Sequence, residues 1–492
     1  MSILSNHRFK YALISGALIG FSFPPFFGFF AFVGFVPLII IWSSSNIRES
    51  AKYSYIAALV ANIISLYWIG LNSGADLIPV IASLVAAVLY LSLFWALLGA
   101  VCSYFIKRYI NGLYLIPALW VSMELLRSYG PLAFSWSSLA LTQSNFLPIL
   151  QIMDITGSEG VSFWVLIVNV FLFSLVQQKK FNYKKHLTFL FIILIPMIYG
   201  GVKLFSFDES EWKKRSVSIL QPNIDPNLKW ETSFREQLYS IMDSLNVVAF
   251  EQKPDLVLWP EAALPNYMRV STLKNKYLKL VEEKSTPLMM GTLDYNPSSS
   301  NRKYFNGSIY FKDDGFQIYH KIFLVPFAEY IPLSPKFPIL NKLNFGQGNF
   351  SQGKEFTQFP IDSISFSNMI CYDITDPLLV KNFVKNGARF LTVEANVAWL
   401  QNSSGVRQFF EIAKLRAIEL RTGIALSANT GISGIINPFG KVIKKMDFNR
   451  QGVIKGEVML NKELTFYAKS GNIFAKISFL CVLLCPFILR KK

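Results

Sequence analysis

Three side chains of different chemistry each follow an apolar, strand-like stretch of the sequence: Glu261, Lys321 and Cys371. The stretches are residues 254–261, 319–330 and 363–373. A carboxylate can take the proton of a thiol, and the resulting thiolate can attack a carbonyl carbon. An ammonium group and a backbone N–H can then stabilise the oxyanion that forms. The three residues together therefore indicate a thiol acyl-transfer site.

Cys371 is predicted to lie where a strand turns into a helix, because Thr375 or Asp376 can cap a helix that begins at Pro377. The positive end of a helix lowers the pKa of a thiol, so we expect a raised thiolate fraction. The other three cysteines lie in long apolar runs, which leaves this thiol without a disulfide partner. A lone cysteine is more often buried and inert, but the acid and the lysine upstream favour a catalytic role.

The composition divides the chain into a membrane part and a water-soluble part. Hydrophobic residues make up 52% of the sequence and include 44 phenylalanines, but they are concentrated in part of the chain. Eight apolar runs are candidate membrane spans: residues 11–23, 28–42, 53–71, 78–106, 113–126, 160–176, 187–205 and 473–489. We therefore predict a seven-helix membrane domain at 1–210, a polar domain at 211–469 and a last membrane helix at 470–492.

The basic residues between the runs predict an orientation. Clusters of Lys and Arg lie before the first run, after the second, fourth and sixth runs, and at the end of the chain, all on one side of an eight-span arrangement. Both termini are therefore expected in the cytoplasm, with residues 211–469 on the outer side. The net charge of +17 is partly this topology signal, and no nucleic-acid-binding module accompanies it.

The polar part alternates strand and helix patterns, which predicts a layered α/β domain. One predicted hairpin spans residues 308–325 and carries the lysine. His320 should face away from the site if Lys321 faces it, because neighbours in a strand point to opposite faces. No set of His, Cys or carboxylate residues has metal-ligand spacing and no Walker-type glycine loop occurs, so we expect neither a metal nor another cofactor.

The motifs around the three reactive residues resemble the nitrilase superfamily. They are Trp259-Pro260-Glu261, the lysine strand and Ile370-Cys371-Tyr372. The resemblance implies a Glu-Lys-Cys triad on an αββα sandwich. With the membrane segments included, nearly the whole chain resembles the apolipoprotein N-acyltransferase family, which performs the last step of bacterial lipoprotein maturation.

This resemblance implies a two-step transfer. An acyl chain moves from a membrane phospholipid to the cysteine thiol, and then to the α-amine of the S-diacylglyceryl cysteine of an apolipoprotein. It also implies that Glu329, eight residues after Lys321, assists the lysine, that the N–H of Tyr372 helps to hold the oxyanion, and that Asp373 supports the site. Trp230 is implied in substrate binding, although it could equally pack under a loop. A monomer in the bacterial inner membrane, with its catalytic domain in the periplasm, is expected.

Two positions depart from the family pattern. Asp373 stands where glutamate is usual, and Val397 stands where aspartate is common. These changes leave the triad intact but affect the residues around it, so an inactive or retuned paralogue is one alternative. A membrane-tethered amidase or hydrolase of the same chemistry is a second, and a transporter with an outer ligand-binding domain is a third.

Four charged residues of the membrane part are further candidates. Glu124 and Arg127 lie one helical turn apart, and Asp154 and Glu159 flank the start of the sixth run. Charged residues within a membrane are a functional hypothesis by default. They could also lie in the interface, where they need no function.

Overall fold

The computed structural model describes residues 7–177, 183–296, 302–313, 315–334, 336–337 and 349–492. The chain forms two compact units. Unit 1 comprises residues 1–70, 77–207 and 470–492, and unit 2 comprises residues 71–76 and 208–469.

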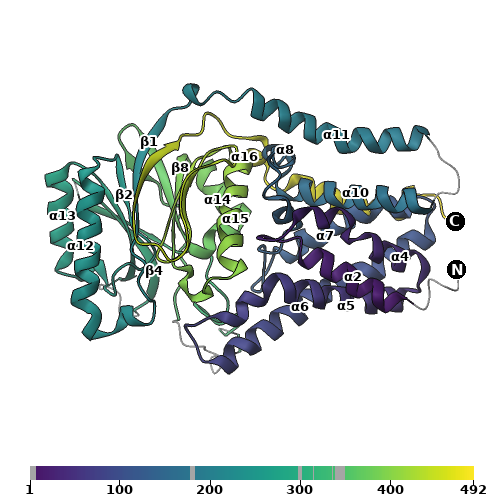
Figure 1. Ribbon diagram of the computed structural model, residues 1–492, viewed down its shortest axis with the longest axis horizontal. Helices are drawn as coiled ribbons and strands as arrows, with labels where there is room; N and C mark the ends of the chain where they lie inside the picture. The colour runs from purple at the N-terminus through teal and green to yellow at the C-terminus, as the bar shows by residue number, and fades with distance from the viewer. Residues whose placement is uncertain (1–6, 178–182, 297–301, 314, 335, 338–348) are drawn as a thin grey trace. The chain divides into compact units, whose positions relative to one another are not determined.

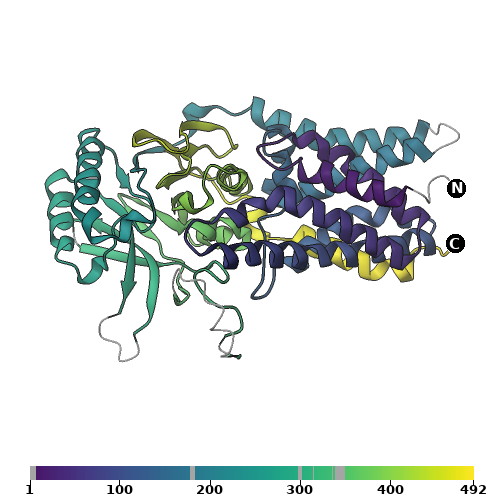
Figure 2. The ribbon, with the colours of Figure 1, turned by 60° about the horizontal axis from the view of Figure 1, so that its bottom comes forward.

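Unit 1 is helical, and its long helices run side by side in both ribbon views (Figures 1 and 2). The α-helices are α2 (Arg8–Gly20), α3 (Ala31–Gly34), α4 (Val36–Ser44), α5 (Ile47–Leu66), α6 (Leu77–Arg108), α7 (Ile116–Arg127), α8 (Leu147–Leu150), α9 (Met153–Thr156), α10 (Ser158–Gln177), α11 (Tyr183–Phe205) and α17 (Ile473–Ile488). Short 3-10 turns join some of them: η1 (Gly28–Phe30), η2 (Tyr67–Leu71), η3 (Gly112–Leu115) and η4 (Leu139–Gln143).

Helices lie at all eight places where the sequence predicts a span. Within the described residues, four helical segments are long and apolar enough to cross a membrane by length and composition: Ile47–Leu71, Leu77–Arg108, Ser158–Gln177 and His186–Phe205. Shorter helices lie at the other four places, and in the second of them η1 and α3 interrupt the apolar run. The eight-span count stays a prediction.

Two charged residues of unit 1, Glu124 and Arg127, bind the backbone of the irregular segment that follows α7. Glu124 accepts a hydrogen bond from the N–H of Leu139 at 2.8 Å, and Arg127 donates to the carbonyl of Ser137 at 2.9 Å. Both charged side chains are buried. Since buried backbone groups need partners, these contacts give Glu124 and Arg127 a structural role. Asp154 accepts a hydrogen bond from the hydroxyl of Tyr199.

Unit 2 contains two six-stranded sheets. The first sheet has the strand order β12-β1-β2-β3-β4-β5, and the second has the order β11-β10-β9-β8-β7-β6. The strands are β1 (Lys214–Gln221), β2 (Leu256–Leu258), β3 (Leu288–Tyr295), β4 (Tyr304–Lys312), β5 (Gly315–His320), β6 (Phe359–Ile361), β7 (Ile364–Ile370), β8 (Ala388–Ala395), β9 (Ile424–Ala428), β10 (Ser433–Ile436), β11 (Val442–Met446) and β12 (Gly452–Met459). Parallel pairs form the centre of each sheet: β1 with β2, β2 with β3, β7 with β8 and β8 with β9.

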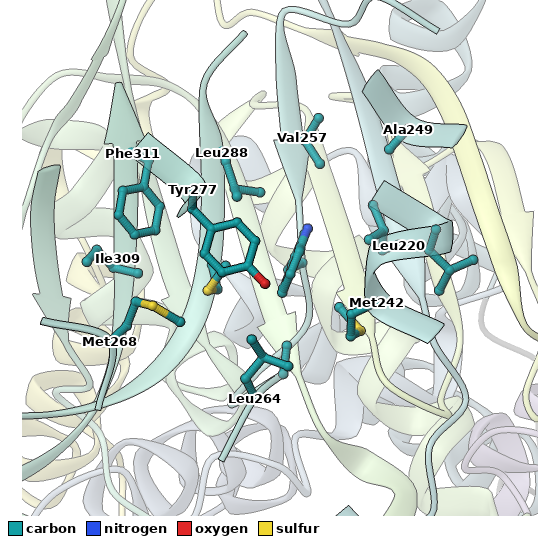
Figure 3. Close-up of a cluster of buried hydrophobic side chains, with 14 of the residues drawn as sticks. Leu220, Met242, Ala249, Val257, Leu264, Met268, Tyr277, Leu288, Ile309 and Phe311 are labelled. Carbon is teal, nitrogen blue, oxygen red and sulfur yellow. The ribbon is translucent and has the colours of Figure 1, made fainter. Parts of the chain in front are cut away.

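Helices cover the outer face of each sheet, so the unit has the layers α, β, β and α (Figure 1). Helices α12 (Arg235–Glu251) and α13 (Leu273–Lys284) cover the first sheet, and α14 (Pro377–Lys385) and α15 (Ser404–Leu420) cover the second. Figure 3 shows the apolar core between the first sheet and its helices, where Tyr277 of α13 packs near Val257 and Leu288. A short helix, α16 (Phe466–Ser470), ends the unit.

The layered α/β prediction agrees with these elements, but some details differ. The predicted hairpin strand continues to residue 325, whereas β5 ends at His320. Strands β6 and β12 were not predicted. Asp314, which lies within the predicted hairpin at 308–325, is outside the described residues.

A six-residue segment between α5 and α6 belongs to unit 2. The N–H of Ser73 donates to the carbonyl of Trp399 at 3.1 Å, and Gln401 donates to the carbonyl of Leu71 at 3.0 Å. These bonds hold residues 71–76 against the turn η11 (Val397–Leu400).

Candidate active site

Glu261 lies just beyond the end of β2, on a segment held against β3. The N–H of Trp259 donates to Met289 O at 2.9 Å, and the N–H of Ala263 donates to Gly291 O at 3.2 Å. Gly291 lets the two segments approach closely, because a Cβ atom there would lie 2.5 Å from Pro260 O and 2.6 Å from the Cα of Glu261. The sheet therefore fixes the backbone of the glutamate.

Lys321 directly follows β5 and lies between two carboxylates. Its Nζ atom is 2.9 Å from Glu329 Oε1 and 3.7 Å from Glu261 Oε1. The lysine side chain is 1% exposed. Burial lowers the pKa of this ammonium, but the charges of Glu329 and Glu261 outweigh burial and raise the pKa above its ordinary value. Lys321 is therefore a permanent positive charge in the site.

Two asparagines that the sequence analysis missed orient the carboxylates. The Nδ2 atom of Asn306 donates to Glu261 Oε1 at 2.8 Å and to Glu329 Oε1 at 2.9 Å. The backbone N–H of Asn396 donates to Glu261 Oε2 at 2.8 Å. Neither group belongs to a recognisable sequence motif. Their roles become visible only when the fold brings them to the two glutamates. Through these bonds both glutamate side chains have fixed directions.

Cys371 lies at the junction between β7 and a 3-10 turn, η10 (Cys371–Thr375). Its φ angle is +47°, in the left-handed region that few non-glycine residues adopt. Helix α14 follows, with Asp376 as its cap accepting hydrogen bonds from the N–H groups of Leu378 and Leu379. The predicted strand-to-helix elbow is therefore present, and a strained backbone holds the thiol at its corner.

The prediction of an acidic thiol is wrong. Burial and the carboxylate of Glu261 raise the pKa of Cys371 well above its ordinary value, against the opposing charge of Lys321 and a hydrogen bond from the backbone of Asn396. The reason is that burial disfavours the charged thiolate, and the negative charge of Glu261 adds to this effect. The resting thiol is therefore protonated and depends on a base for its ionisation.

Asp373 ties the cysteine turn to the segment that follows the lysine. Its Oδ1 atom accepts from the N–H of Phe323 at 2.7 Å, and its Oδ2 atom accepts from the N–H of Ile370 at 3.0 Å and from the hydroxyl of Tyr319 at 2.8 Å. Burial raises the pKa of this carboxyl to about 6. Although aspartate has a shorter arm than glutamate, the carboxylate here has three donors and is fully enclosed.

The other predicted residues lie around this centre. The ring of Tyr372 stacks on that of Phe323, with centroids 4.9 Å apart and an interplanar angle of 7°. Trp230 is half exposed, on the turn η6 (Leu228–Trp230). His320 faces away from Lys321, as expected, and its Nε2 atom is 2.7 Å from Asp294 Oδ2.

Comparisons with known proteins relate both parts of the chain to one protein family. Residues 15–171 match the family model described as the apolipoprotein N-acyltransferase N-terminal domain, and residues 216–463 match carbon-nitrogen hydrolase. An apolipoprotein N-acyltransferase of Geobacter metallireducens is 32% identical, over 94% of this chain and 92% of that protein. One of Chlorobaculum tepidum is 30% identical, over 96% of this chain and 95% of that protein.

A crystal structure of a carbon-nitrogen hydrolase from Helicobacter pylori aligns with 55% of this chain and 99% of its own, at 16% identity and a TM-score of 0.40. The identity and the coverage of the two bacterial relatives are sufficient to assign the family. The chain belongs to the apolipoprotein N-acyltransferase family and carries its carbon-nitrogen hydrolase domain.

Proposed function

We propose that this protein transfers an acyl chain from a membrane phospholipid to the α-amine of the S-diacylglyceryl cysteine of apolipoproteins, through a thioester on Cys371. Family membership supports the overall reaction. The observation that carries the residue roles is the cluster of Glu261, Lys321 and Glu329 around one buried ammonium group, with Cys371 close enough for Glu261 and Lys321 to shift the pKa of its thiol.

In the first step Glu261 takes the thiol proton, and the sulfur of Cys371 attacks the carbonyl carbon of a phospholipid ester. Lys321 and the N–H of Tyr372 hold the oxyanion of the tetrahedral intermediate. The carbon–oxygen bond then breaks, and the lysophospholipid leaves with the proton that Glu261 returns to its oxygen. The products of this step are an acyl thioester and a lysophospholipid with a free hydroxyl group.

In the second step the neutral α-amine of the acceptor attacks the thioester carbon. Glu261 takes a proton from the attacking nitrogen, the carbon–sulfur bond breaks, and the proton passes to the departing sulfur. An amide forms and the thiol is restored. Because the resting thiol is protonated, each cycle begins and ends with a neutral thiol on Cys371, whose new proton comes from the acceptor amine.

Glu329 and Asp373 position the reacting groups. Glu329 holds Lys321 at 2.9 Å and accepts a hydrogen bond from the N–H of Val325 at 2.8 Å. Asp373 fixes the turn that carries Cys371. Trp230 is half exposed, so it can contact a lipid or peptide substrate without a change in the packing of the core.

We further propose eight membrane spans, both termini in the cytoplasm and residues 211–469 in the periplasm. The distribution of basic residues supports this orientation, and a monomer is sufficient because all proposed site residues come from one unit of one chain. A single cysteine introduced at the exposed Lys284 should react with a membrane-impermeant maleimide in intact spheroplasts, and one introduced at Arg490 should react only after lysis. Equal labelling of both positions in intact spheroplasts would contradict the orientation.

The function is tested by intact mass spectrometry of the purified protein after incubation with phospholipid vesicles. We expect an added acyl mass on the wild type and on Cys481→Ala, a control in another free cysteine, and none on Cys371→Ala. A diacylated lipopeptide should release the adduct, whereas water should not. Rapid loss to water would favour a membrane-tethered amidase or hydrolase, and no adduct on any variant would favour an inactive paralogue or a transporter.

A further inference from the structure

Unit 2 holds a second buried lysine that the proposed mechanism does not use. Lys229 lies in the turn η6 (Leu228–Trp230) and is 3% exposed. Its Nζ atom lies 5.9 Å from the centre of the Trp230 ring. Among the residues that the structure describes, this ammonium group makes no ion pair and no hydrogen bond. Buried lysines are rare unless they are paired, so an unpaired one needs an explanation.

The turn that carries Lys229 is attached to the residues that hold Glu261. The side chain of Asn429 accepts from the N–H of Ile224 at 3.0 Å and donates to Ile224 O at 2.7 Å. The same Nδ2 atom donates to Asn396 Oδ1 at 3.2 Å, and the N–H of Asn396 donates to Glu261. The N–H of Lys229 donates a hydrogen bond to Asp225 O at 3.2 Å. Lys229 is therefore held near the active site by a continuous series of hydrogen bonds.

Lys229 takes no part in the ion pairs among the described residues of the site. Two carboxylates of the site, Glu329 and Glu261, pair with Lys321 instead. Burial lowers the pKa of Lys229 to about 8, and the carboxylate of Glu261 only partly opposes this effect. At neutral pH the group is still mostly protonated, so the folded protein keeps a largely buried positive charge that forms no ion pair with a described residue. Such a charge favours the binding of an anion.

We infer that Lys229 binds the phosphodiester group of the phospholipid acyl donor and thereby selects phosphate-bearing lipids. The inference rests on the proposed function, which supplies this donor. In a phospholipid the phosphodiester lies a few bonds from the ester carbonyl that Cys371 attacks. A cation near Glu261 but outside the Glu261–Lys321–Glu329 cluster is suited to that anion, and its bond to the phosphate would place the carbonyl at the thiol.

The same charge has the opposite effect on the second substrate. The acceptor presents an α-amino group, which an adjacent ammonium repels when it is protonated. Only the neutral amine attacks a thioester. Lys229 therefore attracts the donor in the first step and favours the reactive form of the acceptor in the second.

The test compares two donors that differ only in the phosphate headgroup. Full-length wild type and Lys229→Met are incubated in the same detergent micelles with a phospholipid or with a diacylglycerol carrying the same acyl chains, and formation of the Cys371 acyl adduct is timed by intact mass. We expect the ratio of the phospholipid rate to the diacylglycerol rate to fall about tenfold or more in Lys229→Met. Lys229→Arg should retain most of the ratio, and the exposed-surface control Lys284→Met should retain all of it.

A measurement on the wild type alone keeps the inference testable if Lys229→Met does not fold. The same ratio should decline as the pH rises past about 8, because the ammonium then loses its proton. Inorganic phosphate added at the lipid concentration should not abolish the ratio; if it does, Lys229 binds free anions rather than the donor.

Two results would overturn the inference. An unchanged ratio in Lys229→Met would show that the lysine does not bind the phosphate of the donor. A rate of Cys371 acylation that falls equally with both donors would show that the lysine acts through Glu261 instead. If the wild type forms no adduct with either donor, the proposed function fails as well, and this outcome is distinguishable from the other two.

Discussion

Glu329 lies closer to the ammonium of Lys321 than Glu261 does, at 2.9 Å against 3.7 Å. The shorter ion pair holds the lysine in place, and the longer one leaves the carboxylate of Glu261 less engaged. A carboxylate tightly paired with a cation is a weak base. The difference in distance therefore supports the proposed roles, in which Glu329 anchors the lysine and Glu261 accepts the proton.

Replacement of the anchor should weaken catalysis without removing any reacting group. In Glu329→Gln the ammonium of Lys321 keeps one anionic partner, Glu261, and should move toward it, so the base becomes weaker. We expect the rate of Cys371 acylation to fall at least about tenfold and the free energy of unfolding to fall by about 1–3 kcal/mol. Stopped-time mass spectrometry and thermal unfolding in detergent measure the two effects. The exposed control Glu355→Gln should change neither, and a Glu329→Gln variant as fast as wild type would contradict the assigned role.

The ionisation of the thiol should respond to the two charged neighbours in opposite directions. Glu261→Gln removes a negative charge and should lower the pKa of Cys371, although it abolishes acyl transfer; Lys321→Met removes a positive charge and should raise that pKa. Thiolate absorbance, taken as the difference from Cys371→Ser during a pH titration, measures each midpoint. In the wild type the midpoint should lie above the ordinary value of about 8.5. A midpoint below this value would show that the positive end of α14 lowers the pKa of the Cys371 thiol more than burial and Glu261 raise it.

The close approach at Gly291 should be essential for activity. In Gly291→Ala the new Cβ atom would meet the backbone at Pro260 O and at the Cα of Glu261, so the glutamate segment must move. A displacement of this kind should reduce Cys371 acylation by about 100-fold and the free energy of unfolding by about 1–3 kcal/mol. Gly201→Ala is a suitable control, because its Cβ would meet nothing within 4 Å. Near-normal acylation by Gly291→Ala would mean that the segment adapts at no cost.

The buried carboxyl of Asp373 should make stability depend on pH. Its pKa is about 6 in the folded protein, against about 3.9 in an unfolded chain. The folded state therefore keeps a proton that the unfolded state releases, and the resulting stabilisation is complete below about pH 4 and is lost as the pH rises through about 6. The loss amounts to about 3 kcal/mol at most.

Thermal unfolding of the full-length protein in detergent measures this effect across that pH range. Other carboxylates also titrate there, so the comparison with Asp373→Asn isolates the contribution of this residue. Between pH 4 and pH 6 the unfolding temperature of the wild type should decrease relative to that of Asp373→Asn. Parallel curves for the two proteins would show that the carboxyl does not titrate as inferred.

The sequence indicated Glu261, Lys321 and Cys371 as candidate site residues because each follows a short apolar strand, and strand ends in such a domain lie together. It also predicted α14, because Asp376 and Pro377 carry the local signals of a helix start. It did not predict Asn306 or the N–H of Asn396, because the partners of a hydrogen bond between distant strands leave no local pattern. The pKa of Cys371 was predicted in the wrong direction, because burial and neighbouring charges depend on the whole fold.

The end of β5 was predicted wrongly and β12 was missed, in both cases because contacts between distant parts of the chain decide the structure. Strand β5 ends at His320 because the N–H of Phe323 donates to the side chain of Asp373 instead of to a neighbouring strand. Strand β12 was missed because it contains two glycines and two charged residues, which lower the local strand signal. It is formed by its pairing with β1, more than 200 residues earlier in the chain.

That pairing of β1 and β12 suggests a history for the architecture. Lys214 is opposite Met459 in the register, so the chain enters and leaves unit 2 at adjacent positions. A folded module whose ends meet can be inserted into a loop of another protein without separating the two sides of that loop. A free-standing hydrolase gene could thus have entered the loop before the last helix of a membrane protein in one recombination event, with both parents already able to fold.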